Sequence, residues 1–485
     1  MNRDYSNKIA NKYLFSILIS IFLLGCNLEN KKASNNQNSN PPPNFIFILA
    51  DDQGWNGTSV QMMQNEPLSK SDYHETPNLE KLAKSGIKFS NAYSAAPVCA
   101  PSRYSIQFGK SPARLSVIRV GMNTDHIPHD SLISIPKALK KINENYVTAH
   151  FGKWGIGSHP KTLGYDQSDG ATKNKDGGFI NNKTQWENHI NEDPKKIFSL
   201  TKKAIKFISE NVKQRKPFFV QLSHYAVHAN LEMKEKSLLK FQNKNKGQQH
   251  INAGFSAMTQ DLDEGLGLIL KKVDELGIAE NTYIIYMSDN GAVPNIPGAK
   301  KYIKSYNYPL SRGKWDAMEG GVRVPLIISG PSIKANTESS IAVSGCDLLP
   351  TLIDLAGKHP EKLEAIDGGS FKCVLFNQPP QKIKRPVEGI FFHVPYRNGI
   401  ALKRPHSALR NGDYKLLKFQ DNGELLLFNL SNDIKEQCDI SKEKPLKTKA
   451  LEKILDNYLS SVRAPKWKEG ITWKEIPVNQ INSTH

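Results

Sequence analysis

The sequence predicts an α/β fold, in which helices pack on the faces of a central sheet, followed by a smaller C-terminal α+β unit. Two observations predict this fold. Continuously apolar, strand-like runs alternate with segments that carry apolar residues at helical spacing, and near residue 385 this alternation gives way to a hairpin pattern. Of the 485 residues, 38% are hydrophobic and 23% charged, which excludes a collagen-like, disulfide-scaffold or wholly disordered chain. The mean hydropathy of −0.49 excludes a protein with many membrane spans.

The N-terminus predicts export. Three basic residues precede a short apolar run over 14–24, so residues 1–25 have the pattern of a secretory signal peptide rather than of a membrane span. The run ends in Leu-Leu-Gly-Cys, which resembles a bacterial lipoprotein box and implies cleavage before Cys26 and lipidation of its thiol. An ordinary signal peptide with an incidental cysteine is the alternative. Residues 26–43 are rich in Asn, Ser and Lys and predict a flexible tether. We therefore expect a protein anchored by lipid to a bacterial membrane, in the periplasm or at the cell surface.

The net charge of +18 indicates an anionic partner: nucleic acid, acidic lipid or an anionic polysaccharide. Export argues against nucleic acid. The cysteines other than Cys26 show no spacing typical of a zinc site, and a disulfide framework is not expected. A single bridge among Cys346, Cys373 and Cys438 remains open.

Five apolar runs predict strands, because such continuous runs are typical of strands buried on both faces. They are 44–50, 146–151, 217–222, 282–287 and 324–329.

Helical patterns lie between these runs. Thr76-Pro77 begins the first and Gly86 ends it, since proline is favoured at the first helical position and glycine after the last. The others are 198–212, 253–276 and a segment that begins at Asp347.

The larger unit is predicted to span 44–385 and the smaller one 386–485. In the smaller unit, the runs 414–419 and 424–428 flank an Asn-Gly turn typical of a β-hairpin, and an amphipathic helix over 447–462 follows.

Polar side chains follow four of the predicted strands. In open α/β sheets, ligands bind beyond the carboxyl ends of the strands, so we expect these side chains at one rim. Three carboxylates and one amide are hard oxygen ligands that suit Ca²⁺ or Mg²⁺ rather than Zn²⁺. Each pair alone could equally be a turn or a helix cap. The residues are Asp51, Asp52, Lys153, His224, His228, Asp289 and Asn290.

The string Cys99-Ala-Pro-Ser-Arg103 is the most specific motif. Pro101 predicts a helix start, which would place Cys99 where unsatisfied backbone N–H groups favour an anion. A structural cysteine before a turn would explain Cys-x-Pro alone, but not the full string 47 residues after Asp52.

On these motifs the chain resembles the type I, formylglycine-dependent sulfatases over about 44–460. The string matches their Cys-x-Pro-Ser-Arg signature, in which a maturation enzyme oxidises the cysteine to formylglycine. The resemblance implies an alkaline-phosphatase-like domain with a large mixed, mostly parallel central sheet flanked by helices, plus a smaller C-terminal α+β subdomain with an antiparallel sheet. It also implies hydrolysis of sulfate monoesters.

The resemblance assigns roles to individual residues. It implies Ca²⁺, with Mg²⁺ as the alternative, and formylglycine as a protein-derived group. Arg103 would support the formylglycine, Lys153 would bind sulfate, and His228 or Lys314 would protonate the leaving alcohol. The implied metal ligands are Asp51, Asp52, modified Cys99, Asp289 and Asn290.

Two positions depart from the family pattern. Gly155 stands where the family commonly has a histidine, and Lys110 replaces an arginine, which keeps the charge but loses the guanidinium fork.

The basic charge fits a sulfated polysaccharide or oligosaccharide as substrate. His393, Tyr396 and His406 lie where the smaller unit begins and are predicted to line a sugar subsite. An aryl sulfate, a phosphate or phosphonate monoester as substrate, and a catalytically silent glycan-binding lipoprotein are the alternatives.

Overall fold

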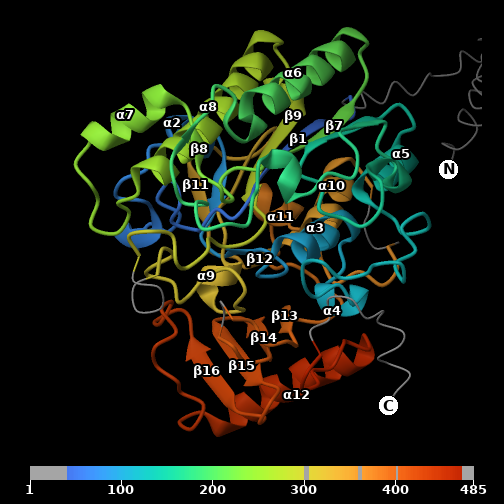
Figure 1. Cartoon of the computed structure of the whole chain (residues 1–485). Coiled ribbons are helices and arrows are strands. Elements are labelled where there is room, and N and C mark those ends of the chain that lie inside the picture. Colours follow the sequence, from blue (N-terminus) through green and yellow to red (C-terminus); the bar gives the residue numbers. More distant parts are fainter. Residues whose placement is uncertain (1–40, 300–304, 359–362, 400–401, 472–485) are drawn as a thin grey trace, which may run out of the picture. The chain divides into compact units, whose positions relative to one another are not determined.

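A computed structural model describes residues 41–299, 305–358, 363–399 and 402–471. In this part of the chain the α/β fold is confirmed (Figure 1). The predicted signal peptide, the lipidation site Cys26 and most of the predicted tether lie outside the described residues. None of the described helices is long and apolar enough to span a membrane.

The central sheet has eight strands in the order β11-β2-β10-β9-β1-β7-β4-β5. The five neighbours from β9 to β5 run parallel, and β10 is antiparallel to both β9 and β2. The expectation of a mixed, mostly parallel sheet is therefore confirmed. The strands are β1 (Asn44–Ala50), β2 (Ile87–Phe89), β4 (Val147–Gly152), β5 (Gln167–Ser168), β7 (Phe218–Ser223), β9 (Thr282–Ser288), β10 (Leu326–Ser329) and β11 (Thr337–Ser339).

Strand β1 shows why its sequence is apolar throughout. Phe45 and Phe47 point into the core on one face of the sheet, whereas Ile46 and Ile48 point into the core on the other. Successive side chains of a strand alternate between faces, so a strand covered on both sides has no polar position.

Helices cover both faces of this sheet (Figure 1). One layer contains α2 (Pro77–Lys84), α6 (Ile197–Lys213), α7 (Glu235–Asn243) and α8 (Ala253–Glu275). The other contains α3 (Cys99–Phe108), α5 (Ile135–Ile142) and α10 (Leu348–Leu355). The predicted helices are confirmed, with boundaries within a few residues.

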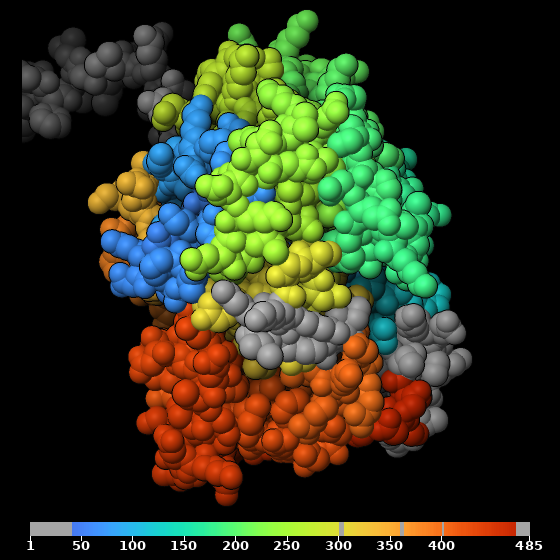
Figure 2. All heavy atoms as spheres, turned by 60° about the vertical axis from the view of Figure 1, so that its left-hand side comes forward, coloured from blue at the N-terminus to red at the C-terminus, as the bar shows by residue number. Residues whose placement is uncertain are grey.

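A separate antiparallel sheet, β13-β14-β15-β16, follows near the C-terminus. Its strands are β13 (Ile390–Val394), β14 (His406–Asn411), β15 (Tyr414–Phe419) and β16 (Leu425–Asn429). The predicted hairpin is β15–β16. Helix α12 (Pro445–Ser461) packs Leu451 and Leu455 on Leu409 and Leu416 of this sheet. These C-terminal elements lie together at the bottom of the view in Figure 2. The antiparallel sheet is confirmed, while the exact domain limits remain predictions.

A buried ion cluster, which we call the linking cluster, joins the C-terminal sheet to the larger unit. Lys415 of β15 lies 2.9 Å from a Glu319 oxygen and 2.8 Å from a Glu436 oxygen, and its side chain is fully buried. The second Glu319 oxygen accepts a 2.6 Å hydrogen bond from Arg323. Because each charge has an opposite partner, these four side chains can be buried together.

The remaining elements are short. They are η1 (Pro67–Ser69), β3 (Ala92–Tyr93), α4 (Pro112–Leu115), η2 (Pro160–Leu163), η3 (Asn174–Gly177), β6 (His189–Ile190), η4 (Pro194–Lys196), β8 (Glu232–Met233), η5 (Ala279–Asn281), α9 (Glu319–Val322), β12 (Val343–Ser344), η6 (Gly345–Asp347) and α11 (Lys372–Leu375). Cys346, Cys373 and Cys438 are unpaired, so the disulfide left open by the sequence is not formed.

Candidate active site

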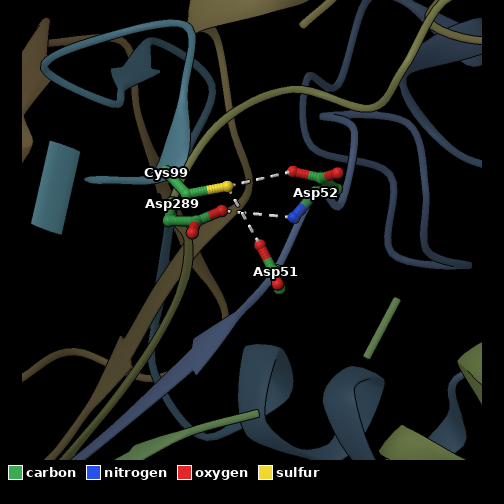
Figure 3. Close-up of side chains that lie close together, drawn as sticks. All are labelled: Asp51, Asp52, Cys99 and Asp289. Carbon is green, nitrogen blue, oxygen red and sulfur yellow. Dashed lines mark hydrogen bonds between the residues drawn. The ribbon is translucent and has the colours of Figure 1, made fainter. Parts of the chain in front are cut away.

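The carboxyl ends of β9, β1, β7 and β4 form one continuous rim, because these strands are neighbours in the sheet. The register pairs Ala50 with Ser288, so the next residues, Asp51 and Asp289, leave the sheet side by side. The backbone N–H of Asp52 donates to Asp289 Oδ1 at 3.1 Å (Figure 3). The two acidic segments are 237 residues apart in sequence, and strand pairing alone brings them together.

Cys99 points into this group of carboxylates. Its Sγ lies 3.4 Å from Asp51 Oδ1 and 3.6 Å from Asp52 Oδ1 (Figure 3). Helix α3 begins at Cys99 itself, not at Pro101 as the sequence suggested, so Cys99 lies in the first turn. Burial among carboxylates raises the pKa of the thiol well above its usual value, although Lys153 and Lys314 oppose this. The thiol is therefore protonated at neutral pH.

The cluster fits an oxygen-ligated cation. One ligand atom from each of Asp51, Asp52, Cys99 and Asp289 lies within 4.8 Å of the others. Asn290 donates its amide to Asp52 Oδ1 at 2.7 Å, while its Oδ1 is buried and has no hydrogen-bond partner among the described residues. Carboxylates beside an unpartnered amide oxygen are a donor set that suits Ca²⁺ or Mg²⁺.

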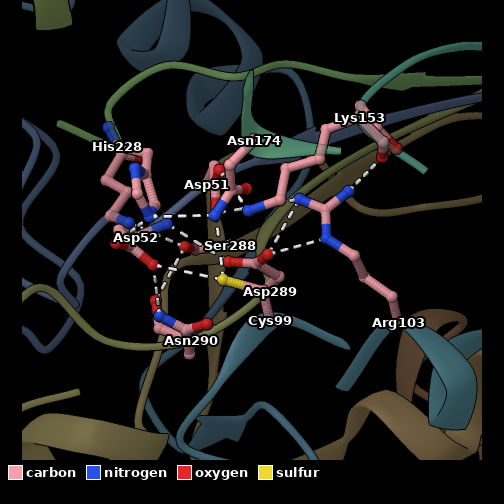
Figure 4. Close-up of polar contacts among 12 residues, drawn as sticks. Asp51, Asp52, Cys99, Arg103, Lys153, Asn174, His228, Ser288, Asp289 and Asn290 are labelled. Atoms are coloured by element: carbon pink, nitrogen blue, oxygen red, sulfur yellow. Dashed lines mark hydrogen bonds and ion pairs between the residues drawn. The ribbon is translucent and has the colours of Figure 1, made fainter. Parts of the chain in front are cut away.

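Three buried cations face the three carboxylates, and two of them, Lys153 and Arg103, are labelled in Figure 4. Lys153 Nζ lies 2.6 Å from Asp51 Oδ2, and Lys314 Nζ lies 2.7 Å from Asp52 Oδ2. Arg103 donates to Asp289 Oδ2 at 2.8 Å and to the backbone carbonyl of Lys153. We call these six side chains, with Cys99, the reactive cluster.

These ion pairs fix the charge states of the cluster. Burial raises the pKa of Asp51 and Asp52, but Lys153 and Lys314 more than offset it, so both pKa values lie below normal. Burial likewise lowers the pKa of Lys314, yet Asp52 outweighs it, and the pKa lies above normal. The carboxylates are charged and the lysines protonated at neutral pH.

His228, beyond the end of β7, borders the reactive cluster. Its Nδ1 lies 2.7 Å from the Ala229 carbonyl, while Nε2 lies 3.6 Å from Asp52 Oδ2. Burial lowers the pKa of His228 to about 4, although Asp52 opposes the shift. A neutral ring therefore donates from Nδ1 and presents a lone pair at Nε2. His224, which the sequence also placed at this rim, is buried, and neither ring nitrogen has a hydrogen-bond partner among the described residues.

Asn174 is a site residue that the sequence did not reveal. Its Nδ2 lies 3.4 Å from His228 Nε2, and its Oδ1 is buried without a hydrogen-bond partner in the described part of the chain (Figure 4). Thr172 holds this loop against the end of β4, because its hydroxyl donates to Gly152 O at 2.5 Å and accepts from Trp154 N at 2.9 Å. Asn174 belongs to no recognisable motif, so no signal in the sequence could have found it.

The two departures from the family pattern lie in different places. Gly155 has a left-handed backbone with φ of +71°, and a Cβ there would lie 3.1 Å from Arg103 Cδ. A histidine would strain this backbone and press on Arg103. Lys110 donates to the Ala365 carbonyl at 2.6 Å and makes no contact with the reactive cluster.

The residues predicted to bind sugar are buried in the C-terminal unit. His393 lies 2.8 Å from Ser407 Oγ and 2.7 Å from Pro465 O, and His406 Nε2 accepts from Ala317 N at 3.0 Å. Tyr396 is 1% exposed. The two histidines thus have structural partners, whereas the Tyr396 hydroxyl has no hydrogen-bond partner among the described residues, and the role of all three as sugar ligands remains a prediction.

A cavity of about 260 Å³ opens beside the reactive cluster. Asp52, His228 and Lys314 line it, together with aromatic and amide side chains. A bound ester could therefore reach the cations while the rest of the molecule occupies the cavity.

The fold is that of the alkaline-phosphatase-like class of hydrolases. Residues 43–358 match the family model described as Sulfatase, and residues 314–465 match that of the N-sulphoglucosamine sulphohydrolase C-terminal region. The chain therefore belongs to the sulfatase family, whose members are hydrolytic enzymes.

Three similar proteins illustrate the range of this family. The chain is 29% identical over 364 residues to N-acetylgalactosamine-6-sulfatase of Mus musculus, covering 67% of this chain and 65% of that protein's length. It is 25% identical over 471 residues to an ulvan-active sulfatase of Formosa agariphila, covering 90% of this chain and 84% of that protein. Among solved structures, Ps i-CgsB in complex with k-i-k-neocarrahexaose is similar, with a TM-score of 0.71 and 28% identity, covering 89% of this chain and 96% of that one.

Proposed function

We propose that this protein hydrolyses sulfate monoesters on a sulfated polysaccharide or oligosaccharide. The observation that carries the proposal is the reactive cluster, in which Cys99 lies against carboxylates from two distant strands and three buried cations. The similarity to an ulvan-active sulfatase and to Ps i-CgsB bound to k-i-k-neocarrahexaose supports a glycan as the substrate. Export and lipid anchoring through Cys26, at a bacterial membrane, belong to the same proposal and would place the enzyme where such polymers are met.

Two groups would complete the site. A maturation enzyme would oxidise Cys99 to formylglycine, which supplies a hydrated aldehyde as the nucleophile toward sulfur. Asp51, Asp52, Asp289 and Asn290 would hold Ca²⁺, or Mg²⁺, which supplies positive charge to the sulfate oxygens.

The chain's own residues would perform the remaining tasks. Lys153 and Lys314 would neutralise the sulfate oxygens as the S–O bond breaks, since both are buried and protonated. Arg103 would hold Asp289 and the end of β4 in position. We assign the proton of the leaving oxygen to Lys314, which is protonated and lines the cavity, because neutral His228 presents only a lone pair at Nε2 and has no proton there to give.

The test is sulfate release by protein produced together with a formylglycine-generating enzyme. Sulfated galactan and ulvan oligosaccharides would be compared with matched aryl sulfate and aryl phosphate, with and without a chelator. We expect sulfate from an oligosaccharide, little phosphate, and loss of activity on chelation that Ca²⁺ restores. Faster phosphate than sulfate release would favour the phosphate or phosphonate ester alternative. Binding without turnover would favour the silent glycan-binding alternative.

A further inference from the structure

We propose that the cavity beside the reactive cluster is a specificity pocket for one neutral hexose ring, the ring that carries the sulfate. This inference rests on the proposed function and adds the class of sugar and the residues that select it.

The position and size of the cavity define what it can hold. Asp52, His228 and Lys314 line one side, so the sulfate lies there and its sugar extends away from them. The volume of about 260 Å³ is below the range of about 300–1,000 Å³ that drug-sized ligands occupy. The cavity thus fits one ring and not an oligosaccharide.

Aromatic side chains form its walls and are tied to the reactive cluster. The Phe179 ring lies 4.8 Å from the His228 ring, perpendicular to it. Trp315 follows Lys314, and its backbone N–H donates to Pro97 O at 2.9 Å, two residues before Cys99. Trp186 completes the wall from the same loop as Phe179. Flat apolar surfaces of this kind pack against the C–H face of a sugar ring.

The neutral polar groups of the cavity are amides. Asn181, Gln185 and Asn295 line it; Asn181 and Asn295 are exposed, Gln185 is half-buried, and none of the three amides is hydrogen-bonded to another described side chain. Each amide offers both donors and an acceptor, which matches sugar hydroxyls. Among the described lining residues, the charged or ionisable ones are Asp52, His228 and Lys314, which serve the sulfate. A uronate carboxylate would find no further cation on the described walls, so its burial there is costly.

The experiment compares sugars that differ in charge. Protein with the aldehyde at position 99 is assayed on galactose 4-sulfate, galactose 6-sulfate and glucuronic acid 2-sulfate. We expect kcat/KM for at least one galactose sulfate to exceed that for the glucuronate by tenfold or more. Preference for the glucuronate would overturn the inference while leaving the proposed function intact.

Point variants of the lining residues test which side chains select the galactose sulfate. Trp186→Ala and Gln185→Ala should each raise KM for the preferred galactose sulfate about tenfold, with kcat changed much less. Ile180→Ala and Asn182→Ala are the matched controls, because both residues are exposed on the same loop and do not line the cavity. Equal KM values for Trp186→Ala and Ile180→Ala would contradict the inference.

Binding measurements distinguish the proposed sulfate hydrolysis from the proposed sugar pocket. Calorimetry of Cys99→Ala protein with the same sugars should show weaker binding after Trp186→Ala is added. If no substrate releases sulfate but this binding difference is present, the proposed function fails and the pocket stands. If sulfate is released but Trp186→Ala binds as tightly as the control, the pocket fails.

Discussion

The reactive cluster and the linking cluster are both built from buried lysine, arginine and carboxylate side chains, but they differ in what is left unpaired. In the linking cluster, Lys415 contacts two carboxylates and its side chain is 0% exposed. Beside the reactive cluster, the amide oxygens of Asn290 and Asn174 have no hydrogen-bond partner among the described residues, and a cavity reaches Lys314.

This difference separates a structural site from a functional one. A buried polar group without a partner costs free energy and is retained where a ligand supplies the missing contact. The linking cluster pairs its charges with one another, although Glu436 Oε1 lies 2.8 Å from Lys415 Nζ without a well-formed hydrogen bond, so the cluster stabilises the junction between the two sheets. In the proposed function, a cation and a substrate would complete the reactive cluster.

The largest effect is expected from removing the nucleophile. Cys99→Ala should lower sulfate release by at least about 10³-fold, because no other group of the cluster can attack sulfur. Released sulfate from the best oligosaccharide is the measurement. Cys438→Ala is the control, since that cysteine is exposed and unpaired, and it should retain activity. Equal activity of Cys99→Ala and Cys438→Ala would remove the basis of the proposal.

Removing one lysine from each cluster tests the comparison directly. Lys314→Met should lower kcat/KM by about 10²–10³-fold in the presence of Ca²⁺, because it removes a charge that stabilises the transition state. Lys415→Met should instead lower the free energy of unfolding by about 3–5 kcal/mol, because Glu436 is left buried without a cation and Glu319 keeps only Arg323. Kinetics and thermal unfolding of both variants are the measurements. A loss of stability without a loss of activity in Lys314→Met, together with the opposite result in Lys415→Met, would show that the two clusters had been misassigned.

Asn174→Ala should lower kcat by about three- to tenfold, the value of one hydrogen bond, because His228 loses the amide beside its Nε2. The readout is kcat and KM on one substrate, together with the pH profile of kcat/KM, which a merely structural change would not shift. Asn182→Ala, an exposed amide, is the control. An unchanged kcat and pH profile would mean that Asn174 does not act on His228.

The linking cluster predicts a pH-dependent stability. Burial raises the pKa of Glu436 from about 4.5 to about 7, with Glu319 adding to the rise and Lys415 opposing it. The folded chain therefore holds this proton to higher pH than the unfolded chain does. The Glu436 contribution to the free energy of unfolding thus falls as pH rises from about 4.5 to 7, by up to about 1.4 kcal/mol per pH unit.

Glu436→Gln should flatten this dependence. Thermal unfolding at several pH values from 5 to 8 would show it as a smaller decline than in the wild type. A decline of the same size in the variant would assign the proton to another group.

The sequence predicted elements better than their arrangement. The apolar run of β1 follows from burial on both faces, and the helices follow from spacing and from Pro and Gly at their ends. That Asp51 lies beside Asp289 depends on the strand order, which no local pattern encodes. For the same reason the sequence did not reveal that β10 runs antiparallel to its neighbours.

The reactive cluster was predictable where motifs mark it, as at Cys99 and Lys153, and not where contacts are purely tertiary. Asn174 lies in a loop without periodicity, and Glu436 pairs with Lys415 only through the fold. For His393 and His406 the predicted sugar-binding role is untested and stays a prediction. Their aromatic, polar surroundings suggested sugar binding, yet each ring has partners inside the C-terminal unit.

The most direct test is the dependence of activity on the chemical state of position 99. Preparations made with different amounts of maturation enzyme would be analysed by mass spectrometry for the aldehyde in the Cys99 peptide and assayed for sulfate release. The account predicts that specific activity rises in proportion to the aldehyde fraction and vanishes when only thiol is present. Full activity in protein whose Cys99 is entirely thiol would contradict it.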